Sequence, residues 1–136
     1  MTRRPLLALA FALCAQAALA HGGHDHGEHP PVDLPAATAP AITGLRMEKG
    51  TDGFTLTVTT TRFTFAPLGA PETAGTGHAH VYINGSKLAE MEGPTLPIPE
   101  LPFGPHDIRL VLSGTTHSEF AVQGRVIAAE ITFTVD

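Results

Sequence analysis

Apolar and polar residues alternate along several short stretches of the chain. Threonines separate Phe54, Leu56 and Val58, and the same period of two recurs near the C-terminus around Ile131 and Phe133. Such alternation is typical of β-strands with one face on a core, because successive side chains of a strand point to opposite sides. The pattern predicts strands at residues 42–49, 54–59, 61–66, 78–83, 87–91, 107–112, 119–122 and 126–135.

Turn signals separate these segments. Asn84-Gly85 is a strong two-residue hairpin signal, and Gln123-Gly124 marks a second turn. The prolines around 96–103 predict an irregular connection, since proline lacks the backbone donor that a strand interior needs. No stretch has the 3.6-residue period of an amphipathic helix. We therefore expect an all-β fold, an antiparallel two-sheet sandwich of immunoglobulin-like or cupredoxin-like type.

The N-terminal segment has the features of an export signal. Arg3 and Arg4 precede an apolar run at 6–17, and Ala18-Leu19-Ala20 is a small-x-small cleavage site. The apolar run is too short to be a membrane span, so we expect no stable membrane insertion and a periplasmic or secreted protein. We expect three parts: a signal peptide at 1–20, a disordered tail rich in His and Pro at 21–40, and a β-sandwich domain at 41–136.

Composition narrows the chemistry that the secreted part can perform. The only cysteine, Cys14, lies inside the expected signal peptide, so a disulfide and a thiolate ligand are excluded after cleavage. The chain carries a net charge of −5 and has no basic run outside the expected signal peptide. An acidic domain of this kind lacks the electrostatic means to hold nucleic acid, whereas cations remain plausible partners.

Eight histidines stand out in a chain of 136 residues. The most informative pair is His78-Ala79-His80, because residues i and i+2 of a strand share one face and two imidazoles placed so can chelate one ion. The alternative is a pair of solvated histidines on an exposed strand. His106, His117 and Met91 are further candidate ligands, although each histidine alone is better explained as a surface or turn residue and Met91 alone as a core residue.

The tail contains four more histidines beside acidic residues. Such tracts bind divalent ions through interchangeable ligand sets, and a free N-terminal His21 would offer Cu²⁺ an α-amino nitrogen next to its imidazole. The alternative is a solubilising, pH-sensitive spacer. The tail ligands that we expect are His21, His24, His26 and His29.

Much of the domain resembles a group of small secreted bacterial proteins with the pattern Gly-His-Ala-His-x-Tyr-x-x-Gly-x-Lys, often encoded beside copper-handling genes. The matching segments are 63–67, 77–87, 96–97, 104–112 and 116–117. The resemblance implies that His78, His80 and the late histidine His117 are metal ligands. The group often has a further histidine near position 95, where this chain has threonine, and this makes Met91 or His106 a substitute to consider. A weaker likeness links the expected fold and His21 to small periplasmic copper-resistance β-sandwich proteins.

Together these observations predict a metal-binding protein of the bacterial envelope. We expect copper as the ion, with zinc as the alternative, and a role as chaperone, buffer or resistance factor that exchanges the ion with another envelope metal-handling protein. The alternative is an immunoglobulin-like interaction module with incidental histidines. We do not expect an enzyme, because the chain lacks a nucleophile elbow and a helical His-Glu-x-x-His motif.

Overall fold

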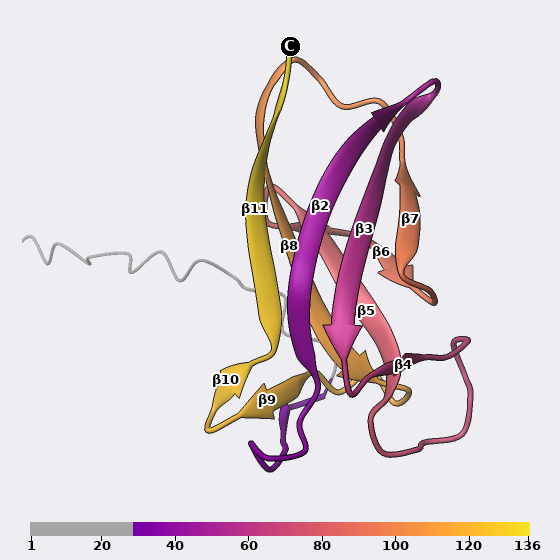
Figure 1. Cartoon of the computed structure of the whole chain (residues 1–136), viewed down its shortest axis with the longest axis vertical. Coiled ribbons are helices and arrows are strands. Elements are labelled where there is room, and N and C mark those ends of the chain that lie inside the picture. The colour runs from indigo at the N-terminus through magenta and orange to yellow at the C-terminus, as the bar shows by residue number, and fades with distance from the viewer. Residues whose placement is uncertain (1–28) are drawn as a thin grey trace, which may run out of the picture.

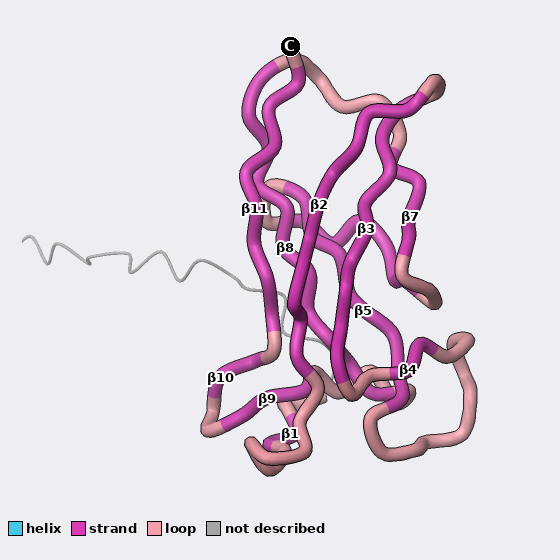
Figure 2. Tube along the Cα trace, in the orientation of Figure 1, coloured by secondary structure: helices cyan, strands magenta, loops and turns pink. Residues whose placement is uncertain are grey.

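The computed structural model describes residues 29–136, so the expected signal peptide and His21, His24 and His26 lie outside the described part. The described residues form strands, turns and loops without a helix (Figure 2). Accordingly, no described segment is a helix long and apolar enough to cross a bilayer. The strands are β1 (Val32–Asp33), β2 (Ala41–Gly50), β3 (Gly53–Thr61), β4 (Thr64–Phe65), β5 (Thr76–Ile83), β6 (Ser86–Met91), β7 (Thr95–Ile98), β8 (Gly104–Gly114), β9 (Phe120–Val122), β10 (Arg125–Val126) and β11 (Ala128–Val135).

Two sheets face each other, which confirms the expected sandwich. One sheet has the order β11-β8-β5-β4, with β6 also paired to β5, and the other has the order β2-β3-β7 (Figure 1). Their neighbouring strands are antiparallel except for the short β4–β5 pair. A small third sheet, β1-β9-β10, closes one end of the molecule.

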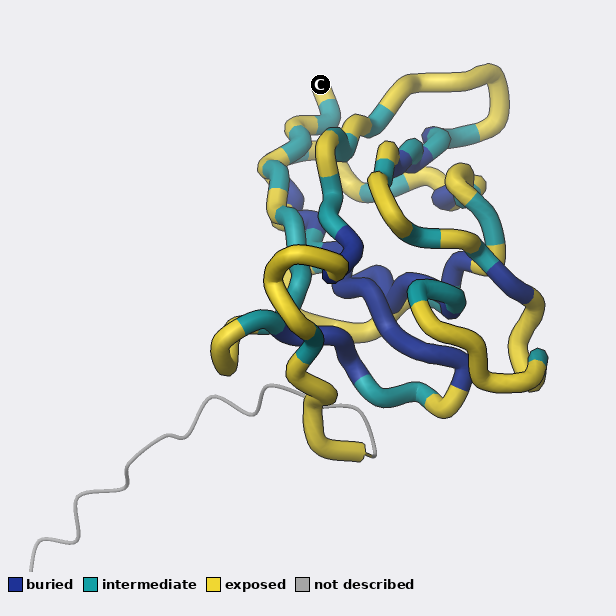
Figure 3. Tube along the Cα trace, turned by 60° about the horizontal axis from the view of Figure 1, so that its bottom comes forward, coloured by how far each residue is buried: buried dark blue, intermediate teal, exposed yellow. Residues whose placement is uncertain are grey.

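The core lies between the two sheets, where the alternating pattern predicts it. β3 contributes the buried apolar side chains of Phe54, Leu56 and Val58. They pack in one core with the odd-numbered positions of β5 and the even-numbered positions of β8. Figure 3 shows the buried segments in the interior of the molecule and the exposed ones mainly at turns and loops. The core residues of the β5–β8 pair are Ala79, Val81, Ile108, Leu110 and Leu112.

Several boundaries differ from the sequence-based expectation: only Thr64–Phe65 of the segment 61–66 form a separate strand, and the strand expected at 126–135 is divided into β10 and β11. Residues 95–98 form an edge strand, β7, although an irregular connection was expected there. Pro97 is tolerated because an edge strand needs ladder hydrogen bonds on one side only. The ordered part also begins before residue 41, because Val32 and Asp33 pair in parallel with β9 and Ala39 is buried.

The outward face of the β5–β8 sheet carries polar side chains. Alternation places His78, His80 and Tyr82 on the side of β5 opposite the core residues. Their partners across the ladder on β8 are Ser113, Val111 and Arg109. This face is where the candidate functional site lies.

Candidate metal centre

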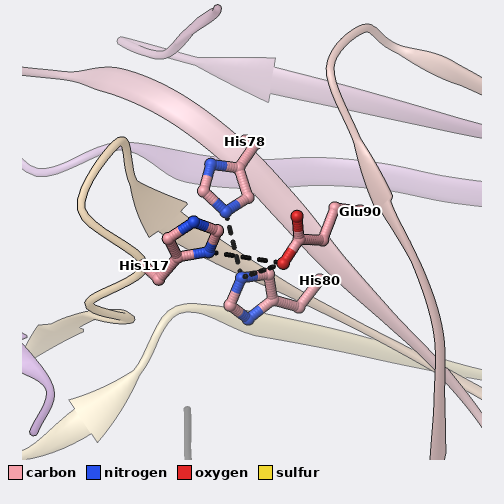
Figure 4. A group of neighbouring side chains, drawn as sticks. All are labelled: His78, His80, Glu90 and His117. Atoms are coloured by element: carbon pink, nitrogen blue, oxygen red, sulfur yellow. Dashed lines mark hydrogen bonds and ion pairs between the residues drawn. The ribbon is translucent and has the colours of Figure 1, made fainter. Parts of the chain in front are cut away.

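His78 and His80 project from the same face of β5. His78 is paired with Ser113 of β8, and His80 is paired on both edges of β5. Both are buried, with 0% and 1% exposure. Their Nε2 atoms are 3.0 Å apart (Figure 4). The two imidazoles are therefore close enough to share one ion, and they are not a pair of solvated surface histidines.

Glu90 comes from the neighbouring strand β6, directly opposite His80. Its Oε1 lies 3.7 Å from His80 Nε2. A regular hairpin from the Asn84-Gly85 turn would pair His80 with Ala89, but the register shifts by one residue at Leu88. This β-bulge moves Glu90 onto the histidine face.

His117 lies in the tight loop between β8 and β9. The backbone of this loop is closed by hydrogen bonds from Gly114 N to Ser118 O (2.9 Å) and from His117 N to Gly114 O (3.1 Å). His117 has a φ of +66°, in the left-handed region that a residue with a Cβ seldom adopts. Its ring packs 4.8 Å from the ring of His78, and its Nδ1 lies 3.3 Å from Glu90 Oε1.

A close approach between β5 and β8 supports this loop. At Gly77 a Cβ atom would lie 1.8 Å from the carbonyl oxygen of Ser113, so only glycine fits there. The Ser113 hydroxyl in turn donates to the carbonyl of Ser118, at 3.0 Å. The base of the His117 loop is thereby fixed against the strand that carries the other two histidines.

These four side chains could together hold a metal ion. Among the described residues, His78, His80, Glu90 and His117 form a group whose donor atoms all lie within 4.8 Å of one another. Two donors at tetrahedral angles around zinc, each about 2.0 Å from the ion, are roughly 3.3 Å apart. The three distances given above, 3.0, 3.3 and 3.7 Å, bracket that value. Three imidazoles and a carboxylate are a ligand set that suits Zn²⁺ and Cu²⁺.

The electrostatics keep the donors in the forms that bind metal. Burial lowers the pKa of His78 below its usual value and lowers the pKa of His80 to about 4, and at His80 the Lys87 ammonium acts in the same direction. Burial alone would raise the pKa of Glu90, but the hydrogen bond from Lys87 and nearby positive groups bring it below its usual value. At pH 7 both rings are neutral and the carboxylate is ionised, as metal binding requires.

Two buried nitrogens in the cluster are unsatisfied. Among residues 29–136, Nδ1 of His78 and Nδ1 of His80 find no hydrogen-bond partner. The nearest acidic group to His80 Nδ1 is the buried carboxylate of Glu119, at 3.9 Å, which also lies 3.5 Å from the Tyr82 hydroxyl. A carboxylate behind a ligating imidazole is the usual way in which proteins orient such a ring.

His106 and Met91 do not complete the cluster. Nδ1 of His106 lies 3.0 Å from Nδ2 of Asn84, and its Nε2 lies 2.7 Å from the carbonyl oxygen of Pro102, so both ring nitrogens are already used. Met91 lies opposite Ala79 and packs in the core, because the bulge turns its thioether away from the histidines. The expectation that one of these two residues supplies the missing ligand is corrected: Glu90, which the sequence analysis missed, lies there.

Only one of the tail histidines, His29, lies in the described part of the chain. His29 is exposed and does not belong to the four-residue cluster. His21, His24 and His26 precede the described residues, so their expected metal binding stays a prediction.

The chain was also compared with known proteins. No protein-family model matches it, and no curated protein matches its sequence significantly. The functional argument therefore depends on the residues of the site.

Proposed function

We propose that this chain is an exported metal-binding protein that holds one divalent ion in the His78–His80–Glu90–His117 site. The observation that carries the proposal is the convergence of these four side chains from β5, β6 and the β8–β9 loop around one point. Without an ion, the facing Nε2 atoms of the two buried imidazoles share a single hydrogen bond of 3.0 Å. A bound ion would replace the nitrogen–nitrogen contact by two metal–ligand bonds.

Copper in the +2 state is the ion that we expect to be held most tightly. Nitrogen and carboxylate ligands suit Cu²⁺ and Zn²⁺, and affinity at a given site of this type is generally highest for Cu²⁺. The thioether that would favour Cu⁺ belongs to Met91, which packs in the core. Zinc remains the alternative ion, and the resemblance to proteins encoded beside copper-handling genes supports copper.

The ligand set favours storage and transfer of an ion over catalysis. Catalytic zinc sites keep one coordination position for water, whereas four protein donors fill a tetrahedral sphere. His78 and His80 are buried, but the side chain of His117 is 42% exposed, and so an incoming ligand can reach the ion from that side. This asymmetry suits a carrier or buffer that exchanges its ion with another envelope protein.

The decisive experiment separates the site from the tail. Cu²⁺, Zn²⁺ and, under reducing conditions, Cu⁺ are titrated into the secreted chain and into a variant in which His21, His24, His26 and His29 are replaced by alanine. We expect the variant to keep one tight site for a divalent ion. At 100 times the dissociation constant, binding should stabilise the fold by about 2.7 kcal/mol.

A matched variant makes the result specific to the cluster. Adding His80→Ala to the tail variant should remove the tight site. The proposal is wrong if the tail variant binds no ion more tightly than a free histidine peptide does. That result would favour the alternative function of an envelope interaction module.

A further inference from the structure

Lys87 lies beside the metal cluster because of the same bulge that brings in Glu90. In a regular strand, residues three apart point to opposite faces. The extra residue at Leu88 places Lys87, opposite Tyr82, and Glu90, opposite His80, on one face of β6. The Lys87 Nζ lies 2.7 Å from Glu90 Oε1.

The ammonium contacts the very oxygen that the site offers to a metal. Oε1 of Glu90 is also the atom that lies 3.3 Å from His117 Nδ1 and 3.7 Å from His80 Nε2. The ammonium therefore donates a charge-assisted hydrogen bond to a ligand atom that faces both imidazoles. Lys87 also contributes to lowering the pKa of both His80 and Glu90, which indicates that its charge is felt throughout the cluster.

We infer that Lys87 is a built-in competitor of the metal ion, which balances the charge of Glu90 when the site is empty and speeds release of the ion when it is full. The inference rests on the proposed function. A divalent ion and an ammonium on the same carboxylate oxygen repel each other. The Lys87 side chain is 38% exposed, so it can swing into solvent when the ion binds and return when the ion leaves.

Removing Lys87 would have the opposite effect on metal binding if its ion pair with Glu90 had only a structural role. If Lys87 served only to hold Glu90 in place, its removal would loosen a ligand and weaken binding. If Lys87 competes with the ion, its removal tightens binding and slows release. The direction of the change therefore separates the two roles.

The test compares Lys87→Met with Lys87→Arg, which keeps the charge, and with Lys49→Met, which removes a lysine from the other sheet. Affinity and dissociation rate are measured for Cu²⁺ and Zn²⁺ at low ionic strength by competition with a chelator. For Lys87→Met we expect roughly tenfold tighter binding and roughly tenfold slower release. The Lys49→Met variant should behave like the unmodified chain, and Lys87→Arg, which keeps the charge, should not show the tighter binding and slower release of Lys87→Met.

Each other outcome has a defined meaning. Unchanged or weaker binding by Lys87→Met overturns the inference but leaves the metal site intact. If the unmodified chain and all variants bind no ion tightly, the proposed function itself fails. Lys87→Gln provides a second neutral variant, and its agreement with Lys87→Met is required.

Discussion

Two buried histidines on one sheet of this protein differ in the hydrogen-bond partners of their rings. The difference separates a structural histidine from a candidate metal ligand. His80 on β5 and His106 on β8 are 1% and 7% exposed. Both ring nitrogens of His106 have partners, Asn84 and the carbonyl of Pro102, and these bonds tie the β5–β6 turn to the start of β8. His80 instead has its Nε2 against another imidazole and its Nδ1 without a hydrogen bond among the described residues.

The comparison shows that the hydrogen-bond partners of a buried histidine say more about its role than its burial does. A buried polar group without a partner costs about 1–3 kcal/mol, and such groups in a folded protein call for an explanation. His106 has no such cost, so a structural role explains it. The cluster around His80 carries the cost at the Nδ1 atoms of both rings, and metal–ligand bonds formed at the facing Nε2 atoms would offset it.

The largest expected effect concerns metal affinity. His80→Ala should weaken binding of Cu²⁺ or Zn²⁺ by roughly 1,000-fold, because it removes one of four donors from a single ion. His106→Ala should change the affinity by less than threefold. Chelator competition measures both variants. Equal losses in the two would mean that the histidines do not divide into the two roles.

A smaller effect on affinity is expected from the carboxylate behind His80. Glu119→Gln keeps the shape of the side chain but removes the charge that faces Nδ1, and loss of such a partner typically costs 10–100-fold in affinity. The matched control is Glu130→Gln, which removes a carboxylate that pairs with Arg109 on the same sheet. If both substitutions leave affinity unchanged, Glu119 does not orient the ligand.

The metal-free protein should lose stability as the pH falls. The pKa of His80 is lowered from 6.5 to about 4 on folding, so the unfolded chain binds the proton more readily between these values. The contribution of this group to stability is therefore complete above pH 6.5 and is lost progressively as the pH falls to about 4. Between pH 7 and pH 5 the loss should be about 2 kcal/mol in urea unfolding. His80→Gln should flatten the profile, and a profile unchanged by that substitution would contradict the assignment.

The smallest expected effect is the loss of fold stability when His106 is replaced. His106→Ala leaves Asn84 and the carbonyl of Pro102 without their partner, and the expected loss in free energy of unfolding is about 1–2 kcal/mol. Denaturant unfolding of the metal-free protein measures it. His106→Gln, which can restore one of the two hydrogen bonds, should recover part of the loss, and no difference between the variants would count against the structural role.

Much of the fold follows from alternation alone. The threonine-separated positions of β3 and the apolar positions of β11 have the period of a half-buried strand, and they form the expected sandwich. Sequence reasoning missed β7 because the prolines suggested a break, and whether an edge position tolerates Pro97 depends on the sheet order. It also placed the domain boundary too late, since the pairing of β1 with β9 joins residues far apart in the chain.

The site was only half visible in the sequence. The shared face of His78 and His80 follows from local strand geometry. Glu90 was missed because a regular hairpin after Asn84-Gly85 would put Met91 opposite His78 and turn Glu90 toward the core. A single bulge exchanges the faces to which these two side chains point. The residues from Ser86 to Met91 contain no local signal that predicts the bulge.

The bulge at Leu88 has one more consequence, which concerns how such sites diverge. With the same residues but no bulge, Leu88 would pair with Val81, the sulfur of Met91 would face His78, and the carboxylate of Glu90 would turn toward the core. The preferred ion would then shift from a divalent cation toward Cu⁺. In this hairpin the register of one strand, shifted by a single residue, therefore sets the softness of the ligand set, and it can change the preferred metal while every histidine is kept.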